Sequence, residues 1–361
     1  MTIALPTILQ PGAINQTISQ LNVINDRLQN FFIGGGGTDS TSGRYFSWDI
    51  YNDSREVGSG RVPGTPPARV APNIVGNVTG EFPRWHESIP LLYEKIHNMR
   101  QLGSLNPDIA GEAYITKQEA YLAQRAVNHR EFQFVGMTRG KYYYTRNGDL
   151  LTVSLTSGNI TIDFQVAAGN IGQLNMLGAG AIIAASWNTA GTDIPAHVAG
   201  IDKAFEVLTG RPVRHAWCNS VRMNYILNND KVRQIAGTAN RVYDRYERLP
   251  NNDFVVVLPA MPYITWHVTN GVLSLDQTTT ALFDDDYVMF TAEPDPSWIQ
   301  YGQGSEVVIE YPGATPTERF GAYFWAEPTT KPAGYELTGV MNGIPKLYNP
   351  NCIAYAKVAN Y

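Results

Sequence analysis

The side chains that could carry acid–base or nucleophilic chemistry are few and scattered along the chain. The histidines form no HExxH motif and no other i, i+4 pair that would bind a metal ion. There is no GxSxG elbow and no local Cys/His pair that would activate a thiol. A glycosidase pair of carboxylates could still be assembled from distant positions, because such a pair needs no local motif. The six histidines are His86, His97, His129, His197, His215 and His267.

Three short motifs superficially resemble ligand-binding loops. Residues 136–141 (GMTRGK) have three residues between the glycines where a phosphate-binding loop has four, and Tyr142 replaces its Ser or Thr. Residues 178–180 (GAG) lack the third glycine of a dinucleotide fingerprint. Asp284–Asp286 lacks the alternating spacing of a calcium loop, so a solvated turn is favoured over an ion site. We therefore predict no catalytic residue, no cofactor and no metal site.

The cysteines and tryptophans are interpreted mainly as packing residues. Cys218 and Cys352 lie outside any CxxC or Cys/His spacing and are expected to be buried and reduced. Trp48 and Trp85 lie in strand-like segments and suit an interface or a sugar-binding surface. The other tryptophans are expected to pack mostly in the core. These are Trp187, Trp217, Trp266, Trp298 and Trp325.

The composition excludes several classes of protein. The chain has 361 residues, of which 43% are hydrophobic and 16% charged, and its formal net charge is −5. A disordered protein, a coiled coil and a basic nucleic-acid binder would each have more charge. Pro6 and Pro11 interrupt an N-terminus without a basic region, so we expect no signal peptide. The apolar stretch 176–187 is too short to span a membrane.

The elements that would position any site begin with two segments that need partners. Residues 14–32 carry apolar side chains at helical spacing and predict an amphipathic helix, which the glycines 34–37 would end. Residues 44–88 predict a long hairpin with a Pro- and Gly-rich tip between residues 55 and 72. Because an isolated two-stranded ribbon is marginally stable, we expect this hairpin to lie on another molecule.

The middle of the chain predicts helices followed by a hairpin. Residues 89–103 are expected to form a short helix with Ser88 as N-cap. Thr116–Glu119 has the form of a capping box and is expected to open a longer helix. Three strands then follow around Asn147-Gly148, a strong hairpin signal.

From Trp187 onward the pattern is mixed α/β. A helix is expected over 193–209, with Pro195 in its first turn and Gly210 as its stop. VRHAWC (213–218) predicts a strand, and Asn219 caps a further helix. FVVVLP (254–259) predicts a buried strand, and the residues beyond it, to 340, are expected to be loop-rich with scattered strands.

The order of these elements resembles the tailed-phage major capsid proteins, in particular the lambda-type capsid protein E family with the Hong Kong 97-type fold. Three parts of the sequence carry the similarity. The first runs from AYLAQ (120–124) through the Asn147-Gly148 hairpin to Asp163-Phe164. The second comprises Trp187, DIPAHVAGIDKAFEVLTGRP (193–212) and CNSVRMNYILNNDKVR (218–233). The third is IPKLYNPNCIAYAKV (344–358).

The resemblance implies an α+β subunit with four named parts. It implies an N-terminal arm over 1–33, an extended E-loop over 34–88 and an axial A-domain over 187–340. The P-domain, with its long spine helix and β-strands, would comprise 89–186 and a returning C-terminal strand over 341–361. Eight residues are candidates for inter-subunit contacts. These are Phe31, Trp48, Arg55, Arg61, Arg69, Trp85, Arg125 and Arg130.

The resemblance also implies function and partners. The chain would form the pentamers and hexamers of an icosahedral shell around a double-stranded DNA genome, assembled in the host cytoplasm. Its partners would be other copies of itself, a scaffold protein, a portal, a decoration protein and non-specifically contacted DNA, with no membrane. Some shells of this fold are cross-linked through an E-loop lysine, but residues 44–88 contain no lysine and the first in the chain is Lys95.

Two alternative functions remain open. An encapsulin-like nanocompartment shell would have the same fold, although its chain would be expected to lack the long Pro- and Gly-rich hairpin. A Trp-rich carbohydrate-binding protein or glycosidase would run as a monomer and would need convergent carboxylates. The triangulation number, the host and the inward-facing surface do not follow from the sequence.

Overall fold

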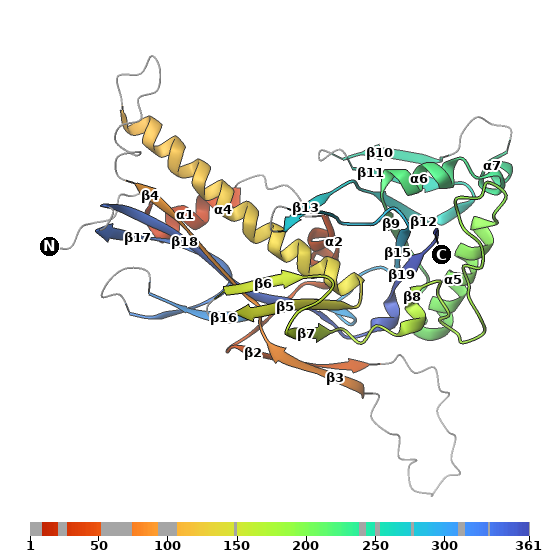
Figure 1. The fold of residues 1–361 in the computed structure, drawn as a ribbon, viewed down its shortest axis with the longest axis horizontal. Helices are drawn as coiled ribbons and strands as arrows, with labels where there is room; N and C mark the ends of the chain where they lie inside the picture. Colours follow the sequence, from red (N-terminus) through yellow and green to blue (C-terminus); the bar gives the residue numbers. More distant parts are fainter. Residues whose placement is uncertain are drawn as a thin grey trace, which may run out of the picture.

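A computed structural model gives the fold of the chain. It describes residues 9–20, 27–51, 74–92, 107–147, 150–237, 243–249, 253–275, 278–309, 315–330 and 333–360. The molecule is elongated, with a long helix and a long-stranded sheet in one half and a seven-stranded sheet with three helices in the other (Figure 1). No helix among the described residues is long and apolar enough to span a membrane.

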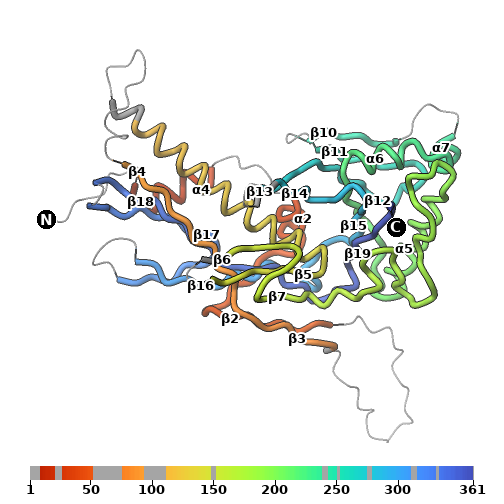
Figure 2. The backbone as a smooth tube through the Cα atoms, in the orientation of Figure 1, coloured from red at the N-terminus to blue at the C-terminus, as the bar shows by residue number. Residues whose placement is uncertain are grey.

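A five-stranded sheet runs through the half that contains the long helix α4 (Pro107–Thr138) (Figure 2). Its first strand pairs in parallel and the others antiparallel. Its order is β1 (Thr38–Thr41), β16 (Ile299–Val308), β17 (Thr317–Thr330), β18 (Ala333–Leu347) and β4 (Arg84–Leu92). The loop-rich segment predicted up to residue 340 is therefore wrong, because β16, β17 and β18 are among the longest strands of the subunit.

The short helix predicted over 89–103 is also wrong in its described part. Ser88, the expected N-cap, lies inside β4 opposite Thr338 of β18, and its hydroxyl donates to Glu336 Oε1 at 2.5 Å. Pro90 is tolerated there because β4 is the edge strand of the sheet. Pairing with a 15-residue partner strand outweighs the local capping pattern. Residues 93–103 of that prediction lie outside the described residues.

A seven-stranded sheet forms the core of the other half. Helix α5 (Ile194–Thr209), helix α6 (Ser220–Leu227) and helix α7 (Asp230–Ala236) accompany it. The strand order is β10 (Arg245–Arg248), β11 (Phe254–Leu258), β12 (Met261–Val268), β9 (His215–Cys218), β15 (Tyr287–Thr291), β19 (Ile353–Lys357) and β8 (Ile171–Gly172). The last described strand, β19, thus lies in this sheet, whereas β16, β17 and β18 lie in the five-stranded one.

The predicted boundaries of α5 and the predicted start of α6 are confirmed. Asp193 accepts the backbone N–H of Ala196 at 3.0 Å and caps α5, which ends at Gly210 with φ of 71°. Asn219 caps α6 by accepting from Arg222 N. The expected single helix through YILNND is split, because Asn229 begins α7 with a cap of its own.

Three small sheets complete the fold. A hairpin joins β2 (Tyr45–Tyr51) to β3 (Ile74–Glu81), which confirms the strands at its base. The predicted three strands around Asn147-Gly148 are also confirmed, with β5 in the centre. They are β5 (Lys141–Asn147), β6 (Leu150–Ser154) and β7 (Ile160–Asp163). Strands β13 (Val272–Leu275) and β14 (Thr278–Ala281) form the remaining pair.

The N-terminal segment forms α1 (Pro11–Gln20) and α2 (Arg27–Gly36), where a helix over 14–32 was predicted. Residues 21–26 of that prediction lie outside the described residues. The glycines do not end α2 where expected. A Cβ at Gly35 or Gly36 would collide with the carbonyl oxygens of Pro294 and Ile299. Glycine is therefore needed here for the close approach of α2 to the start of β16.

The capping box predicted at Thr116 is wrong, because α4 already includes Pro107. Thr116 lies inside the helix and its hydroxyl donates to the carbonyl of Glu112 at 3.0 Å. Glu119, the expected partner in the box, is fully buried. A Ser/Thr side chain within a helix satisfies itself in this way, so the motif does not mark a terminus.

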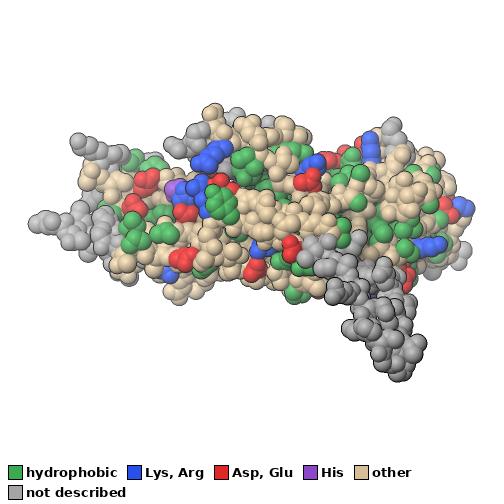
Figure 3. Space-filling view, turned by 90° about the horizontal axis from the view of Figure 1, so that it is seen from below, with side chains coloured by type: hydrophobic (Ala, Val, Ile, Leu, Met, Phe, Trp, Pro, Cys, Tyr) green, Lys and Arg blue, Asp and Glu red, His purple; other side chains and the backbone are tan. Residues whose placement is uncertain are grey.

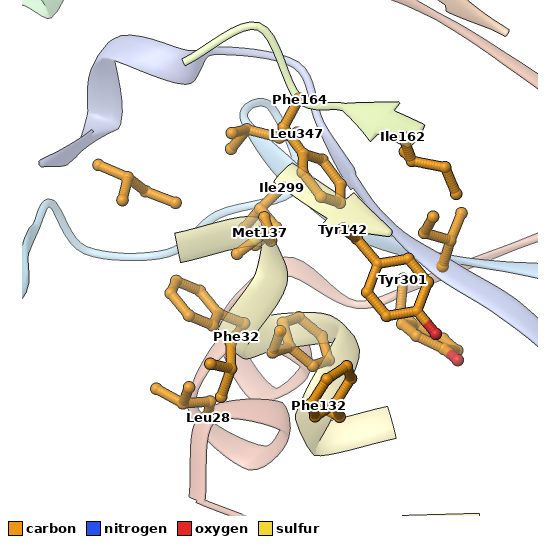
Figure 4. Close-up of a cluster of buried hydrophobic side chains, with 14 of the residues drawn as sticks. Leu28, Phe32, Phe132, Met137, Tyr142, Ile162, Phe164, Ile299, Tyr301 and Leu347 are labelled. Carbon is orange, nitrogen blue, oxygen red and sulfur yellow. The ribbon is translucent and has the colours of Figure 1, made fainter. Parts of the chain in front are cut away.

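The largest hydrophobic cluster joins both halves of the molecule. Phe32 of α2 stacks on Phe134 of α4 at 5.6 Å between ring centroids and meets Trp298 edge-on. Figure 4 shows α2 and the end of α4 converging with β5, β7 and β16 in this cluster. All seven tryptophans are buried, so the expectation of core packing is confirmed for the five C-terminal ones and extends to the other two.

Candidate assembly surfaces

The hairpin β2–β3 has one face in the subunit core and one in solvent. Phe46, Trp48 and Ile50 alternate inward, and Trp48 Nε1 donates to Leu347 O at 3.0 Å. On the opposite face Tyr45 is 70% exposed and Val75 63% exposed. The expectation that this hairpin lies on another molecule is therefore wrong for the inner face of its base, which packs within the subunit. The outward face still presents apolar side chains without cover.

Three of the eight candidate contact residues pack inside the subunit. Trp48 and Trp85 are both less than 10% exposed. Phe31 is half-buried against the rings of His215 and Trp217, with centroid distances of 4.8 and 5.3 Å. In this conformation, little of these rings is left for a neighbouring copy to contact.

The arginine candidates divide into two groups. Arg55, Arg61 and Arg69 lie outside the described residues. Arg125 is half-exposed on α4 and donates to both carboxylate oxygens of Glu87. The hydrogen bonding to Glu87 and the negative charge of Glu87 raise the pKa of Arg125. Arg130 lies 5.2 Å from the centre of the Tyr301 ring.

A second exposed apolar strip was not predicted from the sequence. Val307 and Ile309 at the end of β16 are 64% and 50% exposed, and Phe320 of β17 is 40% exposed. Ser305 pairs with Phe320 in the β16–β17 ladder, which brings the three side chains to one end of that hairpin. The short apolar run VVI (307–309), flanked by Glu306 and Glu310, is the signal that could have indicated a strand here.

A third group of exposed apolar side chains lies on the half with the seven-stranded sheet. It comprises Val221 and Tyr225 of α6, Ile235 of α7, and Tyr243 and Tyr246 at β10. Strand β10 is an edge strand, and its charged residues Arg245 and Glu247 pair with each other. On the face in Figure 3, hydrophobic, basic and acidic side chains are intermixed among polar ones.

His215 and His267 lie in structural contacts. His215 Nδ1 is 3.0 Å from His267 Nε2, and His215 Nε2 is 2.7 Å from Glu293 Oε2. The His267 ring stacks on Trp217 at 4.3 Å, and burial together with the adjacent His215 lowers the pKa of His267 to about 3. A neutral imidazole fits this packed position. The rings of His215 and His267 both contact the ring of Phe31, and these contacts link α2 to the seven-stranded sheet.

The three side chains of Asp284–Asp286 each contact a different partner. Asp284 pairs with Arg139, Asp285 accepts from Asn219, and Asp286 accepts from Asn360. Within the described ranges no three His, Cys, Asp or Glu side chains are grouped as a metal site would require. The two cysteines are buried and are not joined by a disulfide, and burial raises the pKa of Cys218 to about 12, which suits packing rather than reactivity.

Solved structures show the same fold. A putative capsid protein of a prophage from Escherichia coli CFT073 matches with a TM-score of 0.59 and 14% identity, covering 97% of this chain and 99% of that one. A phage-related protein from Bordetella bronchiseptica RB50 matches with a TM-score of 0.51 and 10% identity, covering 97% of each chain. A search of curated proteins found no match.

The family comparison covers nearly the whole chain. The model of the phage major capsid protein E family matches residues 13–358. That family consists of structural capsid proteins rather than enzymes. The chain therefore belongs to the phage major capsid protein E family, and it is a shell-forming capsid protein with an α+β, Hong Kong 97-type fold.

Proposed function

We propose that copies of this chain form hexamers and pentamers that close an icosahedral shell around the double-stranded DNA of a tailed phage. The observation that carries this proposal is the set of apolar side chains left exposed on three separate extended parts of the subunit. They lie on the outer face of β2–β3, at the end of β16–β17 and around α6, α7 and β10. A subunit in a closed shell needs several such surfaces, because it contacts neighbours on every side.

We assign the parts of the subunit as follows. The N-terminal arm comprises 1–33 and the E-loop 34–88, including β2 and β3. The P-domain comprises 89–186 and the returning C-terminal strand over 341–361, and the A-domain comprises 187–340. The sheet order favours extending the P-domain to β16–β18, because these strands pair with β1 and β4.

Other components would complete the particle. We propose a separate scaffold protein, a portal and a decoration protein as partners, with assembly in the host cytoplasm and only non-specific contact with DNA. The net charge of −5 is compatible with a wall from which the genome must leave. The family match favours a phage shell over an encapsulin-like nanocompartment.

The proposal is tested by electron microscopy of particles from cells that express the chain with candidate scaffold proteins. We expect closed shells in which fivefold and sixfold capsomers are resolved. Shells that formed in normal yield from this chain alone would contradict the scaffold assignment. The absence of capsomers with every candidate would contradict the proposal itself.

We further predict that these shells are held without covalent bonds between subunits. Residues 44–88 contain no lysine, so the E-loop cannot supply an amine for an isopeptide bond. Particles boiled in denaturant should run as a single band at 39.9 kDa. A ladder of covalent oligomers on the same gel would show that this prediction is wrong.

A further inference from the structure

The carboxyl group of Glu119 is enclosed in the subunit, and the part of the chain that the structure describes offers it no hydrogen bond. The Glu119 side chain in the middle of α4 has no solvent exposure, and neither Oε1 nor Oε2 has a hydrogen-bond partner among the described residues. Buried polar atoms are nearly always hydrogen-bonded, so each exception calls for a physical explanation. Glu131 on the same helix is also buried, but its oxygens accept the backbone N–H groups of Leu28 and Gln29 at 2.8 and 3.0 Å.

The surroundings of Glu119 are apolar. It lies one helical turn from Ile115 and from Leu122 and Ala123, on the α4 face that packs into a separate hydrophobic cluster. The N-terminal segment, β4, β17 and β18 supply the rest of that cluster. Their side chains are Leu9, Ile14, Trp85, Leu91, Phe324, Ala326, Leu337 and Met341.

No nearby charge compensates this carboxyl group among the described residues. Helix α1 carries no charged side chain, and burial alone raises the pKa of Glu119 to about 7. The charged groups on the other elements of this layer are engaged elsewhere. They are Arg125 with Glu87, Arg84 with Glu306, His86 against Trp325, Glu327 with Trp325 Nε1, and Glu336 with Ser88.

Of the elements over this face, α1 is the most weakly attached. Strands β4, β17 and β18 are fixed by continuous ladders of backbone pairs. Helix α1 is ten residues long and buries only Ile14 completely. Its described hydrogen bonds to the sheet are those of Asn15, which donates to Phe324 O at 2.7 Å and accepts from Phe324 N at 3.2 Å.

We propose that Glu119 is a proton-controlled switch for the docking of residues 9–20 on α4 and β17. While the carboxyl group is protonated, the apolar face of α1 closes over it. When the proton is lost, undocking of the segment lets the carboxylate reach water, which removes the cost of a buried, unpaired charge. The N-terminal segment is thus held at mildly acidic pH and released as the pH rises.

The sign and size of the effect follow from proton linkage. The docked state binds the proton more tightly than the undocked state, so docking weakens as the pH rises from 4.5, the ordinary pKa, through about 7. The ratio of undocked to docked segment should increase about tenfold between pH 6 and pH 8. It should level off above that range, because both states have then lost the proton.

Hydrogen exchange of residues 9–20 in the full chain, corrected for the intrinsic rate at each pH, measures this ratio. Wild-type protein should lose about tenfold in protection between pH 6 and pH 8. Glu119→Gln, which stays neutral, should lose most of that dependence. Glu112→Gln, at an exposed position on the same helix, should behave like wild type.

Two outcomes would overturn the proposal. One is an equal pH dependence in Glu119→Gln and wild type. The other is a wild-type opening that appears in β4 or β18 while residues 9–20 stay protected. If the buried amide of the Gln variant prevents folding, Glu119→Met provides an apolar side chain of similar length, and it should likewise abolish the pH dependence.

Discussion

Replacing residues 57–72 with a short Gly/Ser linker is expected to leave a folded, soluble subunit that forms no closed shells. The subunit should fold because the base of the hairpin is anchored within it, through Phe46, Trp48 and Ile50 and the bond from Trp48 Nε1 to Leu347 O. The shells should be lost because the sequence predicts a hairpin tip here, and an isolated two-stranded ribbon is marginally stable unless it lies on another molecule. The expected yield of closed particles is below detection by electron microscopy.

The matched control keeps the length of the segment but scrambles the order of residues 57–72. Loss of shells in both variants would indicate that specific side chains make the contact, whereas shells in the control alone would indicate that length suffices. Closed shells in normal yield from the shortened variant would show that the hairpin is not the main clamp between subunits. Circular dichroism of each variant establishes that the subunit is folded.

Phe32→Ala is expected to destabilise the subunit by about 3–5 kcal/mol, the usual cost of removing a fully buried phenylalanine ring. Phe32 is 1% exposed and lies between Phe134 of α4 and Trp298 before β16. The close contact of Gly35 and Gly36 with the backbone of Pro294 and Ile299 prevents α2 from moving inward to fill the cavity. Urea-induced unfolding of the isolated subunit measures the loss.

Phe31→Ala on the same helix is the matched comparison. Phe31 is half-buried beside His215 and Trp217, so its truncation should cost only about 1 kcal/mol. A loss in Phe32→Ala as small as in Phe31→Ala would contradict the role of α2 as the element that joins the two halves. A Phe31→Ala subunit of normal stability that failed to assemble would support the inter-subunit role predicted for this ring.

The parts of the fold that could be predicted are those whose conformation depends on residues close together in the sequence. Asp193 caps the start of α5, Gly210 caps its end, and Asn219 caps the start of α6. These positions were predictable because cap geometry depends on only a few neighbouring residues. The β5–β6 strand pair was likewise predictable from the local Asn147-Gly148 signal. The order of such local units was sufficient for the resemblance to the capsid family.

The secondary-structure predictions were wrong where the conformation of a segment depends on residues far away in the sequence. Residues 88–92 form a strand because β18 pairs with them, although Ser88 and Pro90 together resemble the start of a helix. The long strands β16–β18 carry many glycines and polar residues, and only their mutual pairing makes them regular. Gly35 and Gly36 resemble a helix terminus, but they are needed for contact with Pro294 and Ile299.

The assembly surfaces were only partly predictable for a related reason. An aromatic residue on a strand faces the core or a neighbour according to its register, and the sequence does not fix the register of β2. Trp48 is therefore as plausible a contact from the sequence as its neighbours, although the exposed aromatic residues on that strand are Tyr45 and Tyr51. The strip at Val307, Ile309 and Phe320 depends on the β16–β17 pairing and was missed.

The mass distribution of the purified chain tests most directly whether it is a shell subunit. Mass photometry over a range of concentrations, with and without a candidate scaffold protein, should show five- and sixfold multiples of 39.9 kDa or closed particles of much higher mass. A species of 39.9 kDa at every concentration and with every scaffold tested would contradict the account, above all if it also bound or cleaved a glycan.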